Sequence, residues 1–129
     1  MVYASLRHVA LRVSDVPRAR TFYQECLGMK RLWQPDAEQV YLSSGTDILA
    51  LHALPAGEVP SPSGGLDHLG FIVKGKEDVD EIFRAAETAR APILKPPKTH
   101  RDGSYSFYMA DPDGNAVQIL FEPHVSPLL

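Results

Sequence analysis

The chain has little cysteine, no excess of basic residues and no long apolar run, and each shortage excludes a class of protein. Its single cysteine, Cys26, cannot form an internal disulfide, which favours a reducing, cytoplasmic compartment. The 13 Lys and Arg stand against 16 Asp and Glu, a formal charge of −3, so we expect no nucleic-acid partner. The apolar runs are too short for a membrane span and the N-terminus lacks a signal pattern, so we expect no membrane partner.

What the sequence does contain is enough for one compact domain, because 44% of its 129 residues are hydrophobic and can form a core. Two short strand-like runs each begin with histidine, at residues 8–13 (HVALRV) and 68–73 (HLGFIV). A repeat of this length in so short a chain indicates one supersecondary unit used twice. If the two copies pack face to face, two imidazoles approach one site, which predicts a metal centre built by duplication.

The first copy reads as strand, helix and three strands. After strand 8–13, Ser14 or Asp15 can cap a helix and Pro17 suits its first turn. Apolar residues then recur at helical spacing, and Gly28 is a plausible end of the helix. They are Val16, Ala19, Phe22, Tyr23, Cys26 and Leu27, so Cys26 reads as a small core residue and not as a nucleophile. Strands are expected at 30–33, 39–43 and 48–54.

The second copy repeats this order after a turn-rich linker at 55–66. Strand 68–73 precedes a helix with an apolar stripe that stops near Pro92, and strands follow at 93–94, 104–110 and 116–121. The sequence DPDGN at 111–115 predicts a tight turn between the last two strands. The stripe consists of Val79, Ile82, Phe83 and Ala86. On strand 104–110, Tyr105, Phe107 and Met109 share the face expected to be core, and Ser106 and Tyr108 share the other.

In these features the chain resembles the vicinal oxygen chelate superfamily, which includes glyoxalase I, extradiol dioxygenases, fosfomycin resistance proteins and bleomycin-binding proteins. The segments that carry the resemblance are 8–13 with 22–23 and 27–29, then 67–71 (DHLGF), then 111–115. The resemblance implies an α+β fold of two βαβββ modules, residues 5–54 and 67–123, that form a cup-shaped mixed sheet. It also implies that residues 1–129 make a single domain.

The resemblance further implies a divalent metal held by a histidine on the first strand of each module and a carboxylate on the last strand. His8 and His68 match the histidines, but Gln118 stands where the carboxylate is expected, four residues after Gly114. The acidic position of the first module falls near Ala50. Two imidazoles and an amide oxygen could hold Fe2+, Mn2+, Ni2+ or Zn2+, more loosely than with a carboxylate. Glyoxalase I itself is disfavoured because its acidic proton shuttle is missing.

Other residues are candidates to complete this site. His52 lies one pleat from Ala50, about 7 Å along the strand, and is the better reserve ligand, whereas Glu122 lies about 13 Å from Gln118. His52 and Tyr108 are the candidate proton-transfer residues. His100 lies in an expected loop and reads as solvated surface.

Two further residues are candidates for substrate binding. Arg12 shares the face of His8 and can pair with an anionic substrate or form a salt bridge at the strand end. Trp33 is expected in the core or at its rim, or else lining the pocket.

Two functions remain open. The first is a metal-dependent enzyme of the dioxygenase, lyase or isomerase kind that acts on a small substrate with two adjacent oxygens. The second is a metal-free protein that binds or sequesters a small molecule, as bleomycin-binding proteins do, which leaves His8 and His68 without a role. We also expect a homodimer, because small modules of this kind expose sheet edges.

Overall fold

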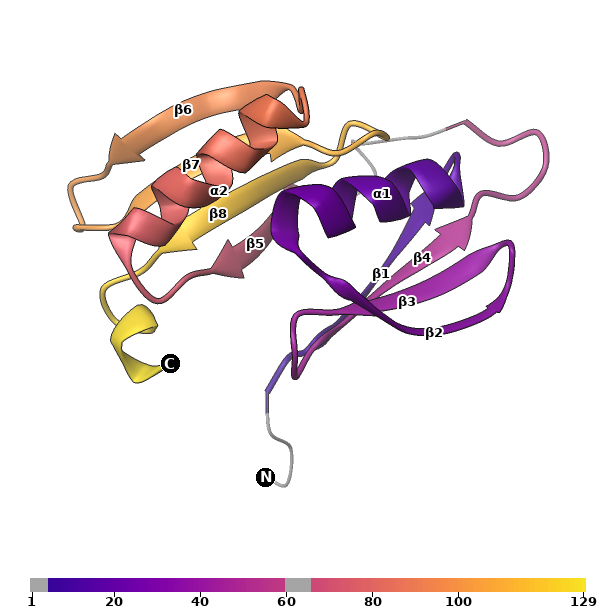
Figure 1. Cartoon of the computed structure of the whole chain (residues 1–129), viewed down its shortest axis with the longest axis horizontal. Helices are drawn as coiled ribbons and strands as arrows, with labels where there is room; N and C mark the ends of the chain where they lie inside the picture. The colour runs from indigo at the N-terminus through magenta and orange to yellow at the C-terminus, as the bar shows by residue number, and fades with distance from the viewer. Residues whose placement is uncertain (1–4, 60–65) are drawn as a thin grey trace. The chain divides into compact units, whose positions relative to one another are not determined.

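The computed structural model describes residues 5–59 and 66–129, which form two compact units, residues 1–60 and 61–129 (Figure 1). The first unit contains β1 (His8–Val13), α1 (Val16–Leu27), β2 (Lys30–Asp36), β3 (Gln39–Ser43) and β4 (Ile48–Ala53). The second contains β5 (Leu69–Ile72), α2 (Lys76–Thr88), β6 (Ile93–Thr99), β7 (Tyr105–Ala110), β8 (Ala116–Phe121) and the 3-10 turn η1 (Ser126–Leu128). Neither helix is long and apolar enough to cross a membrane, and this finding covers the described residues.

Each unit is built around a four-stranded mixed sheet with the same connectivity. The strand orders are β1-β4-β3-β2 and β5-β8-β7-β6. Only the pairs β1–β4 and β5–β8 are parallel, and the other neighbours are antiparallel. The α+β fold class and the order strand, helix, three strands in each half are therefore confirmed. The cup shared by both modules and the single domain over 1–129 stay predictions, and residues 60–65 of the predicted linker lie outside the described residues.

Helix α1 begins and ends as its sequence predicts. The Asp15 side chain accepts a hydrogen bond from the Arg18 backbone N–H at 3.0 Å, which satisfies one free donor of the first turn. Gly28 adopts the left-handed conformation (φ 65°) and ends the helix. The predicted apolar stripe faces the sheet, and burial raises the pKa of the Cys26 thiol. Cys26 is thus a core residue, as expected.

Helix α2 is capped by its own first turn. The Asp78 carboxylate accepts a hydrogen bond from the Gly75 backbone N–H at 3.0 Å. The helix ends at Thr88, well before Pro92, because Arg90 takes a left-handed conformation (φ 58°) that a helix cannot continue through.

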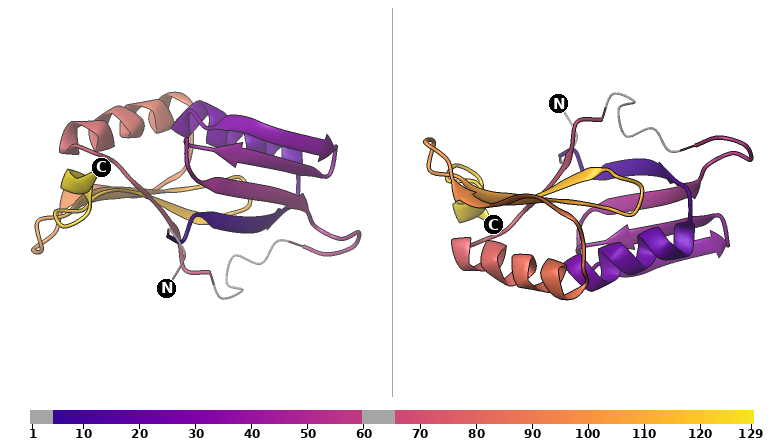
Figure 2. Two further views of the ribbon diagram at one scale, coloured as in Figure 1. Left: turned by 90° about the horizontal axis from the view of Figure 1, so that it is seen from below. Right: turned by 90° about the horizontal axis from the view of Figure 1, so that it is seen from above.

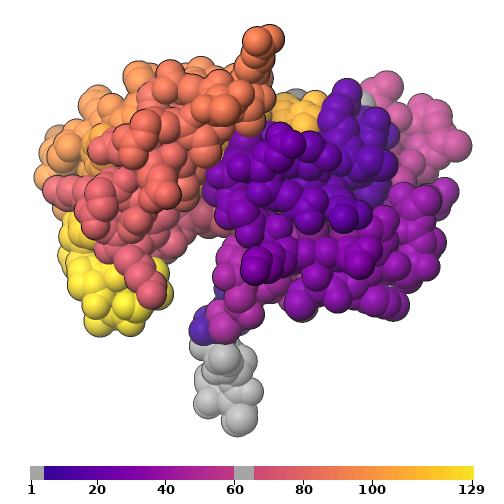
Figure 3. Space-filling view, viewed as in Figure 1, coloured from indigo at the N-terminus to yellow at the C-terminus, as the bar shows by residue number. Residues whose placement is uncertain are grey.

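Each helix packs against one face of the sheet of its own unit (Figure 2). In the space-filling view the salmon atoms of α2 lie beside the orange atoms of the strands that follow it in the second unit (Figure 3). The rings of Phe83 on α2 and Phe107 on β7 meet edge to face, with centroids 5.2 Å apart, and Phe107 and Met109 are fully buried. The Tyr105 hydroxyl donates to Asp80 on α2 at 2.5 Å. Strand β7 therefore turns the predicted core face toward the helix.

The two edge strands that contain proline, β2 and β6, are longer than the sequence predicts. Strand β2 continues past Trp33 through Pro35 to Asp36, and β6 continues past Leu94 through two prolines to Thr99. Both end their sheets, and both pair with irregular register. A proline lacks the N–H that an inner strand must donate, so it is tolerated at an edge or a bulge. The expectation that these strands stop early was wrong for this reason.

Candidate functional site

The face of the second sheet that lies opposite α2, here called the second open face, brings three predicted site residues together. In the strand register Tyr108 of β7 lies opposite Gln118 of β8, and Gln118 lies opposite Gly70 of β5. Side chains alternate along a strand, so His68, two residues before Gly70, shares this face. The His68 ring meets the Tyr108 ring edge-on, with centroids 5.5 Å apart.

The His68 ring is held by its sequence neighbour. Its Nδ1 lies 2.6 Å from a carboxylate oxygen of Asp67. In the neutral imidazole this contact places the proton on Nδ1, so Nε2 carries the lone pair. A carboxylate behind a histidine is the usual second partner of a metal-binding imidazole, because it fixes the tautomer and raises the basicity of the ligand nitrogen.

Gln118 is anchored through its amide nitrogen. Nε2 donates to the hydroxyl oxygen of Ser106 at 3.3 Å, and that hydroxyl also lies 3.2 Å from Nε2 of His100. Ser106 is buried, with 1% of its surface exposed. The amide oxygen Oε1 of Gln118 lies beside Gly70: a Cβ atom added to that glycine would be 3.8 Å from this oxygen. The expectation that His100 is only solvated surface was wrong, because its ring is half-buried and contacts a buried hydroxyl.

A pocket of about 660 Å³ opens beside these residues. It is lined by residues 98–102, Ser104, Tyr108 and Gln118, all of the second unit. Lys95 lies just outside this set, with its Nζ 5.2 Å from the centroid of the Tyr108 ring. Both lysines of β6 reach this face because Lys95 lies opposite Tyr108 and Lys98 opposite Ser106.

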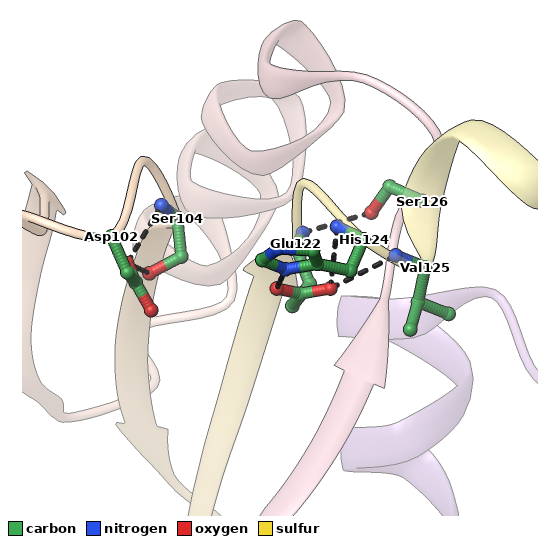
Figure 4. A network of polar contacts seen from close by, with 6 residues as sticks. All are labelled: Asp102, Ser104, Glu122, His124, Val125 and Ser126. Atoms are coloured by element: carbon green, nitrogen blue, oxygen red, sulfur yellow. Dashed lines mark hydrogen bonds and ion pairs between the residues drawn. The ribbon is translucent and has the colours of Figure 1, made fainter.

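Glu122, the distant alternative ligand, is engaged in the C-terminal turn (Figure 4). Its carboxylate accepts hydrogen bonds from the backbone N–H groups of His124 and Val125 at 2.7 and 2.9 Å, and contacts His124 Nδ1 at 2.8 Å. The side-chain hydrogen bond lowers the pKa of Glu122 and raises the pKa of His124. Both oxygens of the Glu122 carboxylate are therefore bonded within the C-terminal turn, beyond the end of β8, which disfavours it as a metal ligand.

The first unit carries a matching open face, opposite α1. The register aligns Arg12 of β1 with His52 of β4, and His52 with Gln39 of β3. His8 shares this face by alternation and is exposed. Arg12 lies 4.0 Å from the carboxylate of Glu58, an exposed pair that contributes little to stability.

Aromatic rings extend this first open face toward the sheet edge. Tyr41 lies between Trp33 and His52, with ring centroids 5.3 and 5.8 Å away. Trp33 is 60% exposed, which contradicts a place in the core and leaves the other two expectations, the rim of the core and the pocket lining, as predictions. It forms part of the aromatic surface that its strand, at the edge of the sheet, presents to solvent.

The donors on the second open face suit a divalent cation in type. His68 offers Nε2 and Gln118 offers Oε1, an imidazole and an oxygen ligand of the kinds that Fe2+, Mn2+, Ni2+ and Zn2+ accept. Across residues 5–59 and 66–129, no three His, Cys, Asp or Glu side chains form a cation-binding group. The metal site of His8, His68 and Gln118 stays a prediction, because it would draw residues from both units.

Sequence reasoning overlooked two features of the second open face. Asp67 was part of the motif at 67–71, but its contact with the histidine beside it was not anticipated. The lysines of β6 were missed because this strand was expected to end at Leu94. Their signal was the spacing of Lys95, Lys98 and Arg101 in a stretch otherwise poor in carboxylates.

The chain is similar to known proteins over most of its length. It is 33% identical to glutathione transferase FosA from Serratia marcescens, over 89% of this chain and 79% of that protein. It is 32% identical to 2,2',3-trihydroxybiphenyl dioxygenase from Sphingomonas paucimobilis, over 90% of this chain but only 40% of the dioxygenase.

Solved structures agree with these relatives. Lactoylglutathione lyase from Agrobacterium tumefaciens superposes with a TM-score of 0.76 and 25% identity, over 94% of this chain and 96% of that one. An integron cassette protein from the mobile metagenome of V. Cholerae gives a TM-score of 0.71 and 28% identity, over 94% and 97% of the two chains. A family model matches residues 5–119. The chain therefore belongs to the Glyoxalase/Bleomycin resistance protein/Dioxygenase superfamily.

Proposed function

We propose that this protein is a divalent-metal-dependent enzyme that acts on a small substrate with two adjacent oxygens, in a reaction of the dioxygenase, lyase or isomerase type. The observation that carries the proposal is the arrangement of His68, with its Nδ1 held by Asp67, on one sheet face with the amide oxygen of Gln118. The similar proteins named above as a transferase, a dioxygenase and a lyase also favour an enzyme.

In this proposal His8, His68 and Gln118 hold the ion. An ion bound there would polarise the substrate oxygens and fix their orientation. The protein residues have separate tasks: Asp67 holds the proton of the neutral His68 ring on Nδ1, which leaves Nε2 to face the ion, and Ser106 keeps the Gln118 amide turned so that its oxygen is available. The lack of an acidic ligand at Gln118 and Ala50 disfavours glyoxalase I itself.

Proton transfer is assigned to Tyr108 and, from the first open face, to His52. Tyr108 lines the pocket and its ring touches His68, so its hydroxyl can hold or deliver a proton beside a bound substrate. Arg12 and Trp33 are assigned to substrate binding, Arg12 by its charge and Trp33 by its exposed ring. We place the protein in the cytoplasm because its one cysteine is a buried core thiol suited to a reducing compartment.

Metal analysis of protein purified without a histidine tag, followed by reconstitution with Fe2+, Mn2+, Ni2+ and Zn2+, tests the proposal. Calorimetry should show one ion per chain, and Gln118→Glu should tighten binding about tenfold or more because an anionic oxygen replaces a neutral one. His68→Ala should abolish binding, since too few strong ligands remain, whereas His124→Ala, at the C-terminal turn, should retain it. Unchanged affinity in Gln118→Glu together with binding by His68→Ala would refute the site.

A metal-free binding protein of the bleomycin-resistance type is the second candidate. The neutral amide of Gln118, tied to Ser106, favours it, because such an amide can hydrogen-bond an organic ligand as readily as it can bind an ion. In that case no ion would bind stoichiometrically in reconstitution, and small aromatic ligands would bind with equal affinity before and after chelation.

A further inference from the structure

We infer that the pocket on the second open face binds the anionic group of a small organic acid. This inference deepens the proposed function, because it names the substrate class of the same site. It concerns the second unit only.

The pocket carries positive charge in a chain that is negative overall. Lys98 and Arg101 line it, and Lys95 stands at its border over the Tyr108 ring. Within the lining itself, the two cations Lys98 and Arg101 stand against one carboxylate, Asp102. The formal charge of the whole chain is −3, so this concentration of cations is a local feature and not a reflection of composition.

The one carboxylate of the lining, Asp102, forms hydrogen bonds within its own loop. Asp102 accepts hydrogen bonds from the Ser104 hydroxyl at 2.7 Å and the Ser104 backbone N–H at 2.9 Å. The same bonds lower its pKa, so it stays ionised as part of the loop. Neither Lys98 nor Arg101 has a carboxylate partner within 4.0 Å among the described residues. Their charges are thus available to a ligand.

The pocket also has the size and the neutral surface that an organic acid requires. About 660 Å³ is within the range of small-molecule sites. The half-buried Tyr108 ring supplies an apolar wall, and Gln118 supplies a polar group at the end where His68 lies. An acid whose anionic group lies between Lys98 and Arg101 would lay its remaining atoms along Tyr108 toward Gln118. Substrates with vicinal oxygens and an acidic group, such as 2-oxo acids, have this layout.

The test is calorimetric titration of the full-length protein, freed of metal by chelation, with three probes at low salt. The probes are pyruvate, its neutral amide pyruvamide, and inorganic phosphate. We expect pyruvate or phosphate to bind with a dissociation constant near or below about 1 mM, and pyruvamide to bind at least about tenfold more weakly. The affinity should fall as salt is raised, because exposed charges are screened. The preferred anion decides between a carboxylate and a phosphate or phosphonate ligand.

Substitutions locate the binding. Lys98→Gln and Arg101→Gln should each weaken anion binding about tenfold. Lys74→Gln, which removes an exposed charge between β5 and α2, should leave it within about twofold. No anion binding by the unmodified protein, equal binding of pyruvate and pyruvamide, or an equal effect of Lys74→Gln and Lys98→Gln would each overturn the inference. The titration uses metal-free protein, so anion binding can be found even if the protein proves to bind no metal. If the protein binds metal but no anion, only the inference about the pocket is overturned and the proposed function is not.

Discussion

At the scale of single residues, the contact between Asp67 and His68 has a measurable consequence. Asp67→Asn should weaken divalent-metal binding about 10- to 100-fold, because the imidazole loses the partner that fixes its tautomer and raises its basicity. Calorimetric titration with the reconstituting metal measures this. Glu87→Gln, which removes an exposed carboxylate from the end of α2, is the matched control and should bind as the unmodified protein does. Equal affinity in Asp67→Asn and in the control would exclude Asp67 from the site.

Gly28, the residue that follows α1, has a backbone conformation that limits substitution. Its left-handed conformation ends the helix, and no atom beyond its two chain neighbours lies within 4 Å of the position a Cβ would take. Gly28→Ala should therefore lower the free energy of unfolding by about 1 kcal/mol through backbone strain alone. Urea denaturation followed by circular dichroism measures the change. A loss much larger than this would indicate packing that the structure does not contain.

At the scale of elements, the C-terminal turn couples two ionisable groups. The hydrogen bond that they share lowers the pKa of Glu122 and raises the pKa of His124. The contribution of His124 is complete below its ordinary pKa of 6.5 and is lost as the pH rises through its raised value. The contribution of Glu122 is present above 4.5 and is lost as the pH falls through its lowered value. The turn should be tightest between these limits, in mildly acidic solution.

An NMR pH titration of the His124 ring tests this coupling. Its midpoint should lie above 6.5, and Glu122→Gln should bring it down, since the anionic partner is removed. Glu87→Gln again serves as a distant carboxylate control. A midpoint unaffected by Glu122→Gln would show that the two side chains do not interact in solution.

Most of the element order could be predicted from the sequence because its signals are local. The Asp15 cap, the Gly28 stop and the apolar stripe of α1 act within a few residues of one another, and the helix forms as expected. The extent of β6 could not be predicted in the same way. Its prolines argue against a strand locally, and they are tolerated only because tertiary structure puts β6 at a sheet edge.

For the candidate site too, the local features could be predicted from the sequence and the long-range contacts could not. Alternation along β7 and β8 was enough to place Tyr108 and Gln118 on faces that the register then aligned. The role of Ser106 as a shared partner of Gln118 and His100 was not accessible, because it depends on a loop that brings residue 100 back over β7. Local periodicity predicts which face a side chain occupies, and long-range pairing decides what it meets there.

At the scale of the whole molecule, the sheet edges lead to a prediction of assembly. Strands β1 and β5 each end their sheets and contain no proline, unlike the opposite edges β2 and β6. Sheet edges without proline can pair with strands of another chain, so we expect a homodimer. Light scattering at micromolar concentrations should give twice the chain mass of 14.2 kDa. A single-chain mass throughout that range would contradict this expectation.

The position of Gln118 on an inner strand has a genetic consequence. Strand β8 pairs with β5 on one side and β7 on the other, so the backbone at residue 118 is fixed from both sides and a new side chain there starts from the same place. The codons for glutamine and glutamate differ in a single base. The neutral amide and the anionic carboxylate are therefore one point mutation apart, on a backbone that need not move. A protein of this family could gain or lose a carboxylate ligand at this position in one mutation and keep its fold.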